Sequence, residues 1–330
     1  PRPSSTARPV DTATPAPAFR VDFAGVSFRV PAGLARTAEA RALPGQGAPD
    51  DPALPPMGLF PPRIEFSFPG YAHGGAFHEP RIMVYSVADY ERLNPVAAEV
   101  ITETRRALAQ RPAVPAQSRL LPLLYAGQTI RARFAYLDFA GGAGFRFVTH
   151  YTQGLIPISS RELFYTFQGL TADGAYYVAA LLPLGASALP DTYEAPAPPG
   201  GPAPPSFDHP DFVTLWPRYL AAGEQALEAL PADEYYPSLE ALDAWMQSLA
   251  VAEPVAVADC PADLRSTLAP EGSAYVSLNP PVSNRLRAAP GVRDVTPNRA
   301  PGTTTGSAPR VAPSTPAPSS SGSTSAPSAQ

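Results

Sequence analysis

The chain has 330 residues and a net charge of −5, and 45 of its residues are proline, nearly three times the usual share of about 5%. All 24 basic residues are arginine and they form no stripe, so we exclude nucleic acid as a partner. No apolar run approaches the roughly 20 residues of a membrane span, so no transmembrane segment is expected, while an apolar share of 45% suffices for a soluble core.

The distribution of the prolines separates a segment that is expected to fold from proline-rich segments that are not. They occupy 13 of the first 62 residues, 8 of the 23 residues at 195–217 and 10 of the last 51, but only 9 of the 128 residues at 63–190. Interior positions of helices and strands reject proline, so the proline-poor part is the folded part. The pattern predicts three segments around or within the fold: a disordered linker at 1–18, a Pro-rich insertion at 191–210 and a Ser/Thr/Pro-rich disordered tail at 292–330.

The first predicted elements are strands. Phe19–Phe23 and Val26–Val30 alternate between apolar and polar residues and are joined by Ala24-Gly25. Arg63–Phe68 alternates in the same way, and Ile82–Tyr85 is a short continuous apolar strand. Together they predict an early group of strands, one face of which is buried.

A helix follows at Asn94-Pro95, where asparagine can cap the helix and proline can occupy its first position. Val96, Val100, Ile101 and Leu108 then give this helix a single apolar stripe. The stripe predicts a helix that packs on the sheet.

Two hairpins come next, one on each side of residue 160. Thr129–Phe139 and Gly144–Gln153 flank Gly141-Gly142, and Glu162–Leu170 and Ala175–Leu182 flank a turn that contains Asp-Gly. Four long strands in two successive hairpins predict an antiparallel sheet.

Two later helices are predicted to cover this sheet. They span Phe212–Leu230, with Pro217 marking a kink or a start, and Ser238–Leu249, with Ser238 as the cap. The fold class is therefore α+β, with an antiparallel sheet of about six strands and packed helices in one domain at 19–250.

The domain resembles the PsbP-like fold, a layered helix–sheet–helix arrangement. Three stretches carry the resemblance: Val26-Ser-Phe-Arg-Val-Pro31, the hairpin Gly169-Leu-Thr-Ala-Asp-Gly-Ala-Tyr-Tyr-Val-Ala-Ala180 and Leu242-Asp-Ala-Trp-Met-Gln-Ser-Leu249. The resemblance implies an accessory or binding role, and the fold itself implies no active site.

The segment 251–291 resembles the beginning of a bacterial SH3-like module. It contains Cys260, then the strand-like Ala274-Tyr-Val-Ser-Leu278, then Asn284-Arg-Leu-Arg-Ala-Ala-Pro-Gly291. The strands of a complete barrel do not follow, so we expect an incomplete module, and two explanations stay open: truncation or a frame shift near Gly291, and a natural disordered tail. In such modules the early cysteine pairs with a later one, which this sequence lacks.

The order of a sheet domain and an SH3-like module is similar to exported proteins of filamentous green non-sulfur bacteria. A Pro-rich spacer ahead of the first strand is also typical of exported bacterial proteins, in which it follows an anchoring cysteine. We therefore expect a location at the cell surface or outside the cell. Lipid anchoring through a cysteine upstream of Pro1 and free secretion stay as alternatives.

Several groups of residues in the sequence are candidates for chemistry. His73-Gly-Gly-Ala-Phe77 is similar to an esterase oxyanion loop, but the sequence has no G-x-S-x-G nucleophile motif, so a glycine-rich loop is expected. The spacing of His73, His78 and Glu79, with His150 or His209 as further ligands, matches no standard metal motif. We expect neither a metal nor a cofactor. The carboxylates near strand ends give no pair that is expected to converge; they are Glu79, Asp138, Glu162 and Asp173.

Arginine and tyrosine side chains on one face of the hairpins form the candidate binding surface. The residues are Arg131, Arg133, Arg146, Tyr151 and Tyr165. Arginine and tyrosine are enriched at binding hot spots, although cross-strand packing of aromatic residues explains much of the same pattern.

The sequence as a whole predicts a non-catalytic, exported cell-envelope protein with a binding or accessory role. Its expected partners are cell-wall material or another envelope protein. Two alternatives stay open: a structural subunit of a surface assembly, which self-assembles through extended termini, and a hydrolase with an unrecognised site.

Overall fold

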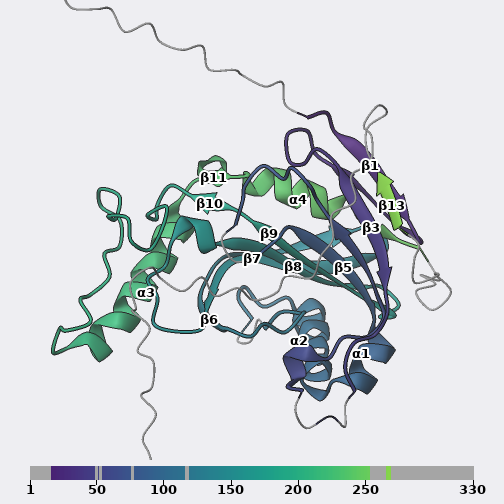
Figure 1. The fold of residues 1–330 in the computed structure, drawn as a ribbon, viewed down its shortest axis with the longest axis horizontal. Helices are drawn as coiled ribbons and strands as arrows, with labels where there is room; N and C mark the ends of the chain where they lie inside the picture. The colour runs from purple at the N-terminus through teal and green to yellow at the C-terminus, as the bar shows by residue number, and fades with distance from the viewer. Residues whose placement is uncertain are drawn as a thin grey trace, which may run out of the picture. The chain divides into compact units, whose positions relative to one another are not determined.

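The fold is built on an antiparallel sheet of eight strands (Figure 1). The structure, a computed structural model, describes residues 16–48, 51, 54–75, 78–115, 119–252 and 265–268; these lie in one compact unit, and the separate unit at 277–330 lies outside them. The strands of the sheet follow the spatial order β13 (Arg265–Leu268), β3 (Ala38–Leu43), β4 (Arg63–Ser67), β5 (Arg81–Ser86), β9 (Tyr176–Pro183), β8 (Phe164–Thr171), β7 (Gly142–Thr152) and β6 (Gly127–Phe139).

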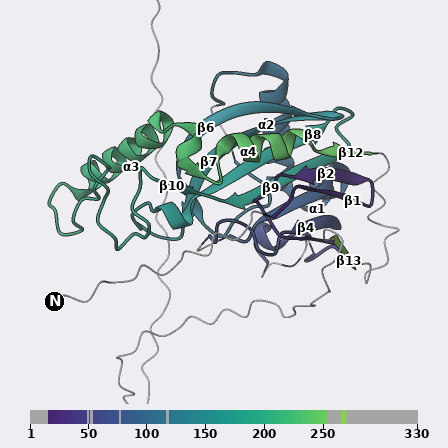
Figure 2. The same ribbon diagram turned by 90° about the horizontal axis from the view of Figure 1, so that it is seen from above.

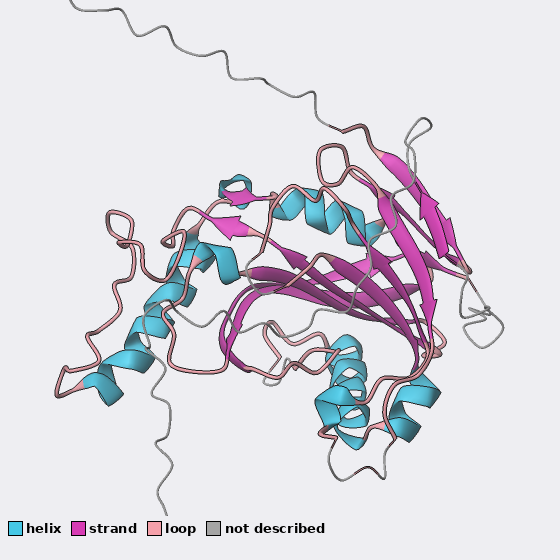
Figure 3. Cartoon of the chain, in the orientation of Figure 1, coloured by secondary structure: helices cyan, strands magenta, loops and turns pink. Residues whose placement is uncertain are grey.

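Helices cover both faces of the sheet (Figure 3). On one face lie α1 (Val87–Leu93) and α2 (Pro95–Gln110); on the other lie α4 (Leu239–Gln247) and the hairpin of β1 (Phe19–Phe23) and β2 (Val26–Val30). The short elements are β10 (Gly185–Ala186), β11 (Tyr235–Tyr236), β12 (Ala250–Val251) and three 3-10 turns at Pro56–Gly58, Ser160–Glu162 and Ala232–Glu234. The remaining helix, α3 (Phe212–Ala229), runs beside the edge strand β6, and its N-terminal end extends away from the sheet (Figure 2).

The two predicted helix caps are confirmed. The Asn94 side chain accepts hydrogen bonds from the Val96 and Ala97 amides at 3.1 Å, and Pro95 is the first residue of α2. Ser238 Oγ likewise accepts from the Ala241 amide and caps α4. α3 begins five residues before Pro217, so this proline lies inside the helix and does not mark its start.

The sheet separates two apolar cores. In β8, Tyr165 and Phe167 face α4 and the β1–β2 hairpin, whereas Phe164 and Leu170 face α2. All eight residues of β8 are buried, as expected for a central strand that is covered on both faces. Trp245 of α4 completes the first core, where its ring lies 4.6 Å from that of Phe68.

The predicted hairpins β1–β2, β6–β7 and β8–β9 are confirmed, but the sheet has eight strands rather than about six. One of the additional strands is β3, which pairs with β4. The other is β13, which lies inside the segment predicted as an incomplete SH3-like module and pairs with β3. Residues 265–268 thus extend the main sheet.

Other predictions fall on parts of the chain that the structure does not describe. Cys260, Ala274–Leu278, Asn284–Gly291 and the tail at 292–330 lie outside the described residues, as do residues 1–15 of the linker. The Pro-rich insertion is described and connects β10 to α3. No helix in the described part of the chain combines the length and the apolar character that a membrane span needs.

Candidate functional site

Two members of the predicted Arg/Tyr surface are buried against α4. The Arg146 guanidinium pairs with the Asp243 carboxylate, with Nε 3.0 Å from Oδ1 and Nη2 3.0 Å from Oδ2. Tyr165 donates its hydroxyl hydrogen to the same carboxylate at 2.9 Å, and burial, followed by the Asp243 charge, raises its pKa well above the ordinary value. Arg146 is 8% exposed and Tyr165 is fully buried, so neither can meet a ligand from solution.

Arg131 and Arg133 lie on the edge strand β6 beside α3, and the Arg131 guanidinium itself donates to the Pro115 carbonyl at 3.0 Å. Their backbone amides donate to the side chains of Glu224 and Glu228, and the Arg133 guanidinium also donates to the Glu228 carbonyl at 3.0 Å. Arg133 sits in a bulge with a positive φ of 57°, which rotates its backbone out of register with β7. The two arginines therefore take part in fastening α3 to the sheet.

Tyr151 belongs to the opposite face of the sheet. Its ring packs 5.8 Å from Phe164 in the core beneath α2, and burial raises its pKa. The five predicted residues thus do not form one exposed surface: helices cover the face of the sheet that carries Arg146 and Tyr165, and Tyr151 contributes to the other core.

His150 forms the centre of a buried polar chain. Its Nε2 lies 2.9 Å from Glu162 Oε2, and its Nδ1 lies 2.7 Å from the Thr129 hydroxyl. A hydroxyl, an imidazole and a carboxylate in sequence are the components of nucleophilic catalysis. However, His150 is fully buried, and Thr129 Oγ1 is also within hydrogen-bond distance of the His150 carbonyl, so the chain has the character of a structural network.

The other candidate ligands and carboxylates are dispersed. His78 packs on Phe164 with ring centroids 4.3 Å apart, and burial together with the Arg81 charge lowers its pKa to about 4. His73 instead approaches Tyr236. Within the described residues, no three His, Cys, Asp or Glu side chains are placed to hold a metal ion.

The four carboxylates near strand ends each have a separate local role. Asp138 pairs with Arg111, Glu79 pairs with Arg81, and Glu162 belongs to the His150 network. Asp173 accepts hydrogen bonds from the Thr171 hydroxyl and then from the Ala175 amide, which lower the pKa of its carboxyl. No two of the four are joined by a hydrogen bond or share a partner in the described part of the chain.

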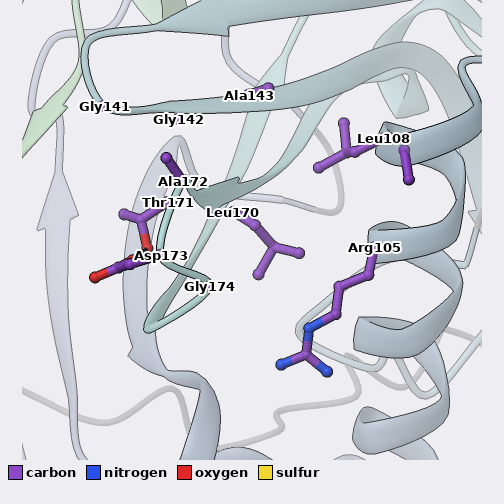
Figure 4. A pocket seen from close by; sticks show the side chains of 11 residues that line it. Arg105, Leu108, Gly141, Gly142, Ala143, Leu170, Thr171, Ala172, Asp173 and Gly174 are labelled. Atoms are coloured by element: carbon purple, nitrogen blue, oxygen red, sulfur yellow. Dashed lines mark hydrogen bonds between the residues drawn. The ribbon is translucent and has the colours of Figure 1, made fainter.

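A cavity of about 560 Å³ lies between α2 and the turns of both long hairpins. Figure 4 shows Arg105 and Leu108 reaching from α2, and Leu170 from β8, into this space. The opposite wall is the backbone of the β6–β7 turn and the β8–β9 turn, which are joined by a hydrogen bond from the Ala172 amide to the Gly141 carbonyl at 2.8 Å.

The two turns place no bulky side chain on this wall of the cavity. Gly141 and Gly174 have φ angles of 83° and 72°, which glycine adopts without strain, and a side chain at either position would extend into open space. The Asp173 side chain points away from α2 in Figure 4 because it is held by its own turn. The wall therefore offers backbone atoms and small side chains to a ligand.

Arg105 is the one cationic side chain of the cavity lining. Its Nη1 lies 2.6 Å from the Glu91 carboxylate, and the two side chains are 44% and 32% exposed. Such a solvated pair is weak, so the guanidinium can be shared with a ligand anion at little cost. The site combines an apolar floor, a backbone wall and one cation.

The sequence indicates the separate elements that line this cavity, but it does not show that they come together. The turns at Gly141-Gly142 and Asp173-Gly174 are visible as hairpin signals, and Leu108 belongs to the predicted stripe of α2. What the sequence does not show is that α2 lies across the turn ends of both hairpins. The chain has also been compared with family models, with curated proteins and with solved structures, and none of them matches it.

Proposed function

We propose that the protein is a non-catalytic binding or accessory protein of the bacterial cell envelope, and that its ligand occupies the cavity between α2 and the two hairpin turns. The cavity carries the proposal: about 560 Å³ is within the range of small-molecule sites, and its lining is mostly apolar with few polar groups. The ligand class that fits is a small amphipathic anion, whose apolar part contacts Leu108 and Leu170 while its negative group pairs with Arg105.

The lining favours binding over chemistry. Its hydroxyl group, that of Thr171, is engaged because it donates to Asp173 and accepts from the Tyr176 amide at 3.0 Å. Arg105 has no acidic or nucleophilic neighbour within the lining that points toward it. A bound molecule would therefore be held rather than converted.

A PsbP-like fold is part of the same proposal. The layered arrangement, with helices on both faces of an antiparallel sheet, supports the resemblance to that fold. Export and a location at the cell surface rest on the Pro-rich sequence and on the resemblance to exported bacterial proteins. Cell-wall material or another envelope protein is the corresponding partner.

Calorimetric titration with two anionic probes, decanoate and muramyl dipeptide, tests the site. At least one probe is expected to bind, and Arg105→Gln should weaken that binding about tenfold, as for loss of one charge-assisted contact. Arg106→Gln is the matched control, because Arg106 is the adjacent exposed arginine outside the cavity. Equal affinities of the two variants, or no binding of either probe, would contradict the proposed site.

A hydrolase is the competing function, and the Thr129–His150–Glu162 chain is the observation that favours it. A panel of ester and amide substrates separates the two. Turnover that disappears in Thr129→Val would replace the binding function with a catalytic one.

A further inference from the structure

A second feature lies at the other end of the molecule, in the segment 191–216, here called the arm. It consists of the Pro-rich insertion and the first turn of α3, and it extends beyond the sheet edge (Figure 1, Figure 2). Three large apolar side chains of the arm are exposed: Tyr193 by 48%, Phe207 by 62% and Val213 by 84%. A protruding segment that exposes several large apolar side chains is a candidate interaction site.

The arm has a fixed internal structure. The rings of Phe207 and Phe212 lie 5.2 Å apart, those of Phe212 and Trp216 lie 5.3 Å apart, and Trp216 continues the series to Tyr219 at 5.4 Å. Backbone turns support the ladder, with the His209 amide donating to the Ser206 carbonyl and the Phe212 amide to the His209 carbonyl, both at 3.0 Å. Trp216 and Tyr219 are buried, so the ladder holds the exposed ring of Phe207 in place, and a preorganised side chain loses little entropy when it binds.

The charge of the arm is of one sign. Residues 191–211 include four carboxylates and no arginine. Asp191 pairs with Arg161 at 3.5 Å, whereas Glu194, Asp208 and Asp211 form no ion pair within the described residues. Phe207 and Asp208 are adjacent and both exposed, so an apolar contact and a negative charge are presented together.

We infer that the arm is a docking site for a polypeptide segment rich in arginine. Guanidinium groups can pair with the unpaired carboxylates, stack on the exposed face of Phe207, and lay their aliphatic stems on Val213. An anionic membrane and a nucleic acid are both disfavoured, because the carboxylates of the arm would face negative charge. A cationic peptide can pair with the carboxylates and cover the exposed apolar side chains at the same time.

The test uses the full chain and fluorescein-labelled dodecapeptides of alternating arginine and leucine, measured by fluorescence anisotropy at two salt concentrations. The wild-type protein is expected to bind this peptide, and less tightly at high salt. Val213→Arg should weaken binding at least about tenfold, because it replaces the most exposed apolar side chain of the arm with a charge that repels the peptide. Val213 is too exposed for this change to affect folding. Leu155→Arg, at another exposed apolar residue, changes the net charge equally and should leave binding unchanged.

A second variant and two further probes complete the test. Glu194→Gln combined with Asp208→Asn and Asp211→Asn should remove the salt dependence together with most of the affinity. Equal binding by Val213→Arg and Leu155→Arg would overturn the inference. Tighter binding of an alternating glutamate–leucine peptide or of phosphatidylglycerol vesicles than of the arginine–leucine peptide would also overturn it. The same holds if size-exclusion chromatography without peptide shows self-association that Val213→Arg abolishes, because the partner of the arm would then be a second copy of the chain.

Discussion

At the scale of single residues, the Arg146–Asp243 pair is a buried ion pair that joins the sheet to α4. The two residues are 97 positions apart, and the Arg146 side chain also donates to the Arg133 carbonyl in the bulge of β6. A buried charge whose partner is removed retains its desolvation cost without the compensating attraction. The pair therefore links strand, bulge and helix.

Asp243→Asn is expected to lower the free energy of unfolding by about 3 kcal/mol or more, because the amide cannot balance the charge of Arg146. Urea denaturation measures the loss. The double variant Arg146→Met with Asp243→Leu should recover a large part of it, since both charges are then absent. A single variant as stable as the wild-type protein would show that Arg146 reaches solvent.

The same pair shows why the site prediction differed from the structure. Alternation along β7 places Arg146 on the face opposite Phe145 and Phe147, which is correct, and an arginine on a strand face ordinarily indicates solvent. The distant Asp243, together with the Arg133 carbonyl, makes its burial possible, and no local pattern connects Arg146 to Asp243. Burial of a charge is decided by its partner, which lies elsewhere in the sequence.

At the scale of elements, α3 acts as a cover for the sheet edge. Glu224 and Glu228 are one helical turn apart, about 5.4–6 Å, and Arg131 and Arg133 are two strand residues apart, about 6.7 Å. This near match lets successive carboxylates accept from successive outward amides of β6. An edge strand with free amides is a template for other chains, so the helix protects the protein from association.

The double variant Glu224→Ala with Glu228→Ala should expose these amides. Hydrogen exchange in the segment 129–135 is expected to accelerate about tenfold or more, which corresponds to the loss of about one charged hydrogen bond per amide. Light scattering should also detect self-association. Gln225→Ala, on the same helix between the two glutamates, is the control; if it accelerates exchange equally, the carboxylates are not the cap.

The elements that the sequence predicts well are those with local signals. Asn94-Pro95, Ser238 and the glycine turns act within a few residues. The two caps are found at the predicted residues, and the first hairpin turn lies one residue earlier than predicted, at Ala140-Gly141. The strand β3 was missed because Ala38–Leu43 contains no β-branched residue and three alanines, which do not favour strands intrinsically. Pairing with β4 and burial of its alanines against the core decide its conformation.

At the scale of the whole molecule, one sheet separates two cores, and the question is whether they unfold together. Both tryptophans, Trp216 and Trp245, lie in the core on the α4 side, so tryptophan fluorescence reports on that side alone. Ile101 of α2 is fully buried in the other core. The two cores share the central strands β8 and β9, whose side chains alternate between them. Loss of packing on the α2 side should therefore reach the tryptophans through these strands.

Ile101→Ala is expected to lower the free energy of unfolding by about 2–5 kcal/mol, the usual cost of a large buried aliphatic truncation. Because the strands are shared, fluorescence and far-ultraviolet circular dichroism should shift to the same new midpoint in urea. Arg106→Ala, an exposed substitution on the same helix, should leave both midpoints in place. If Ile101→Ala moves the circular dichroism transition but not the fluorescence transition, then α2 and its core unfold separately from the rest of the protein. The cavity between α2 and the hairpin turns could then open while the rest of the fold stays intact. Coincident transitions would instead mean that this cavity is as stable as the sheet, because its floor and its wall belong to the same cooperative unit.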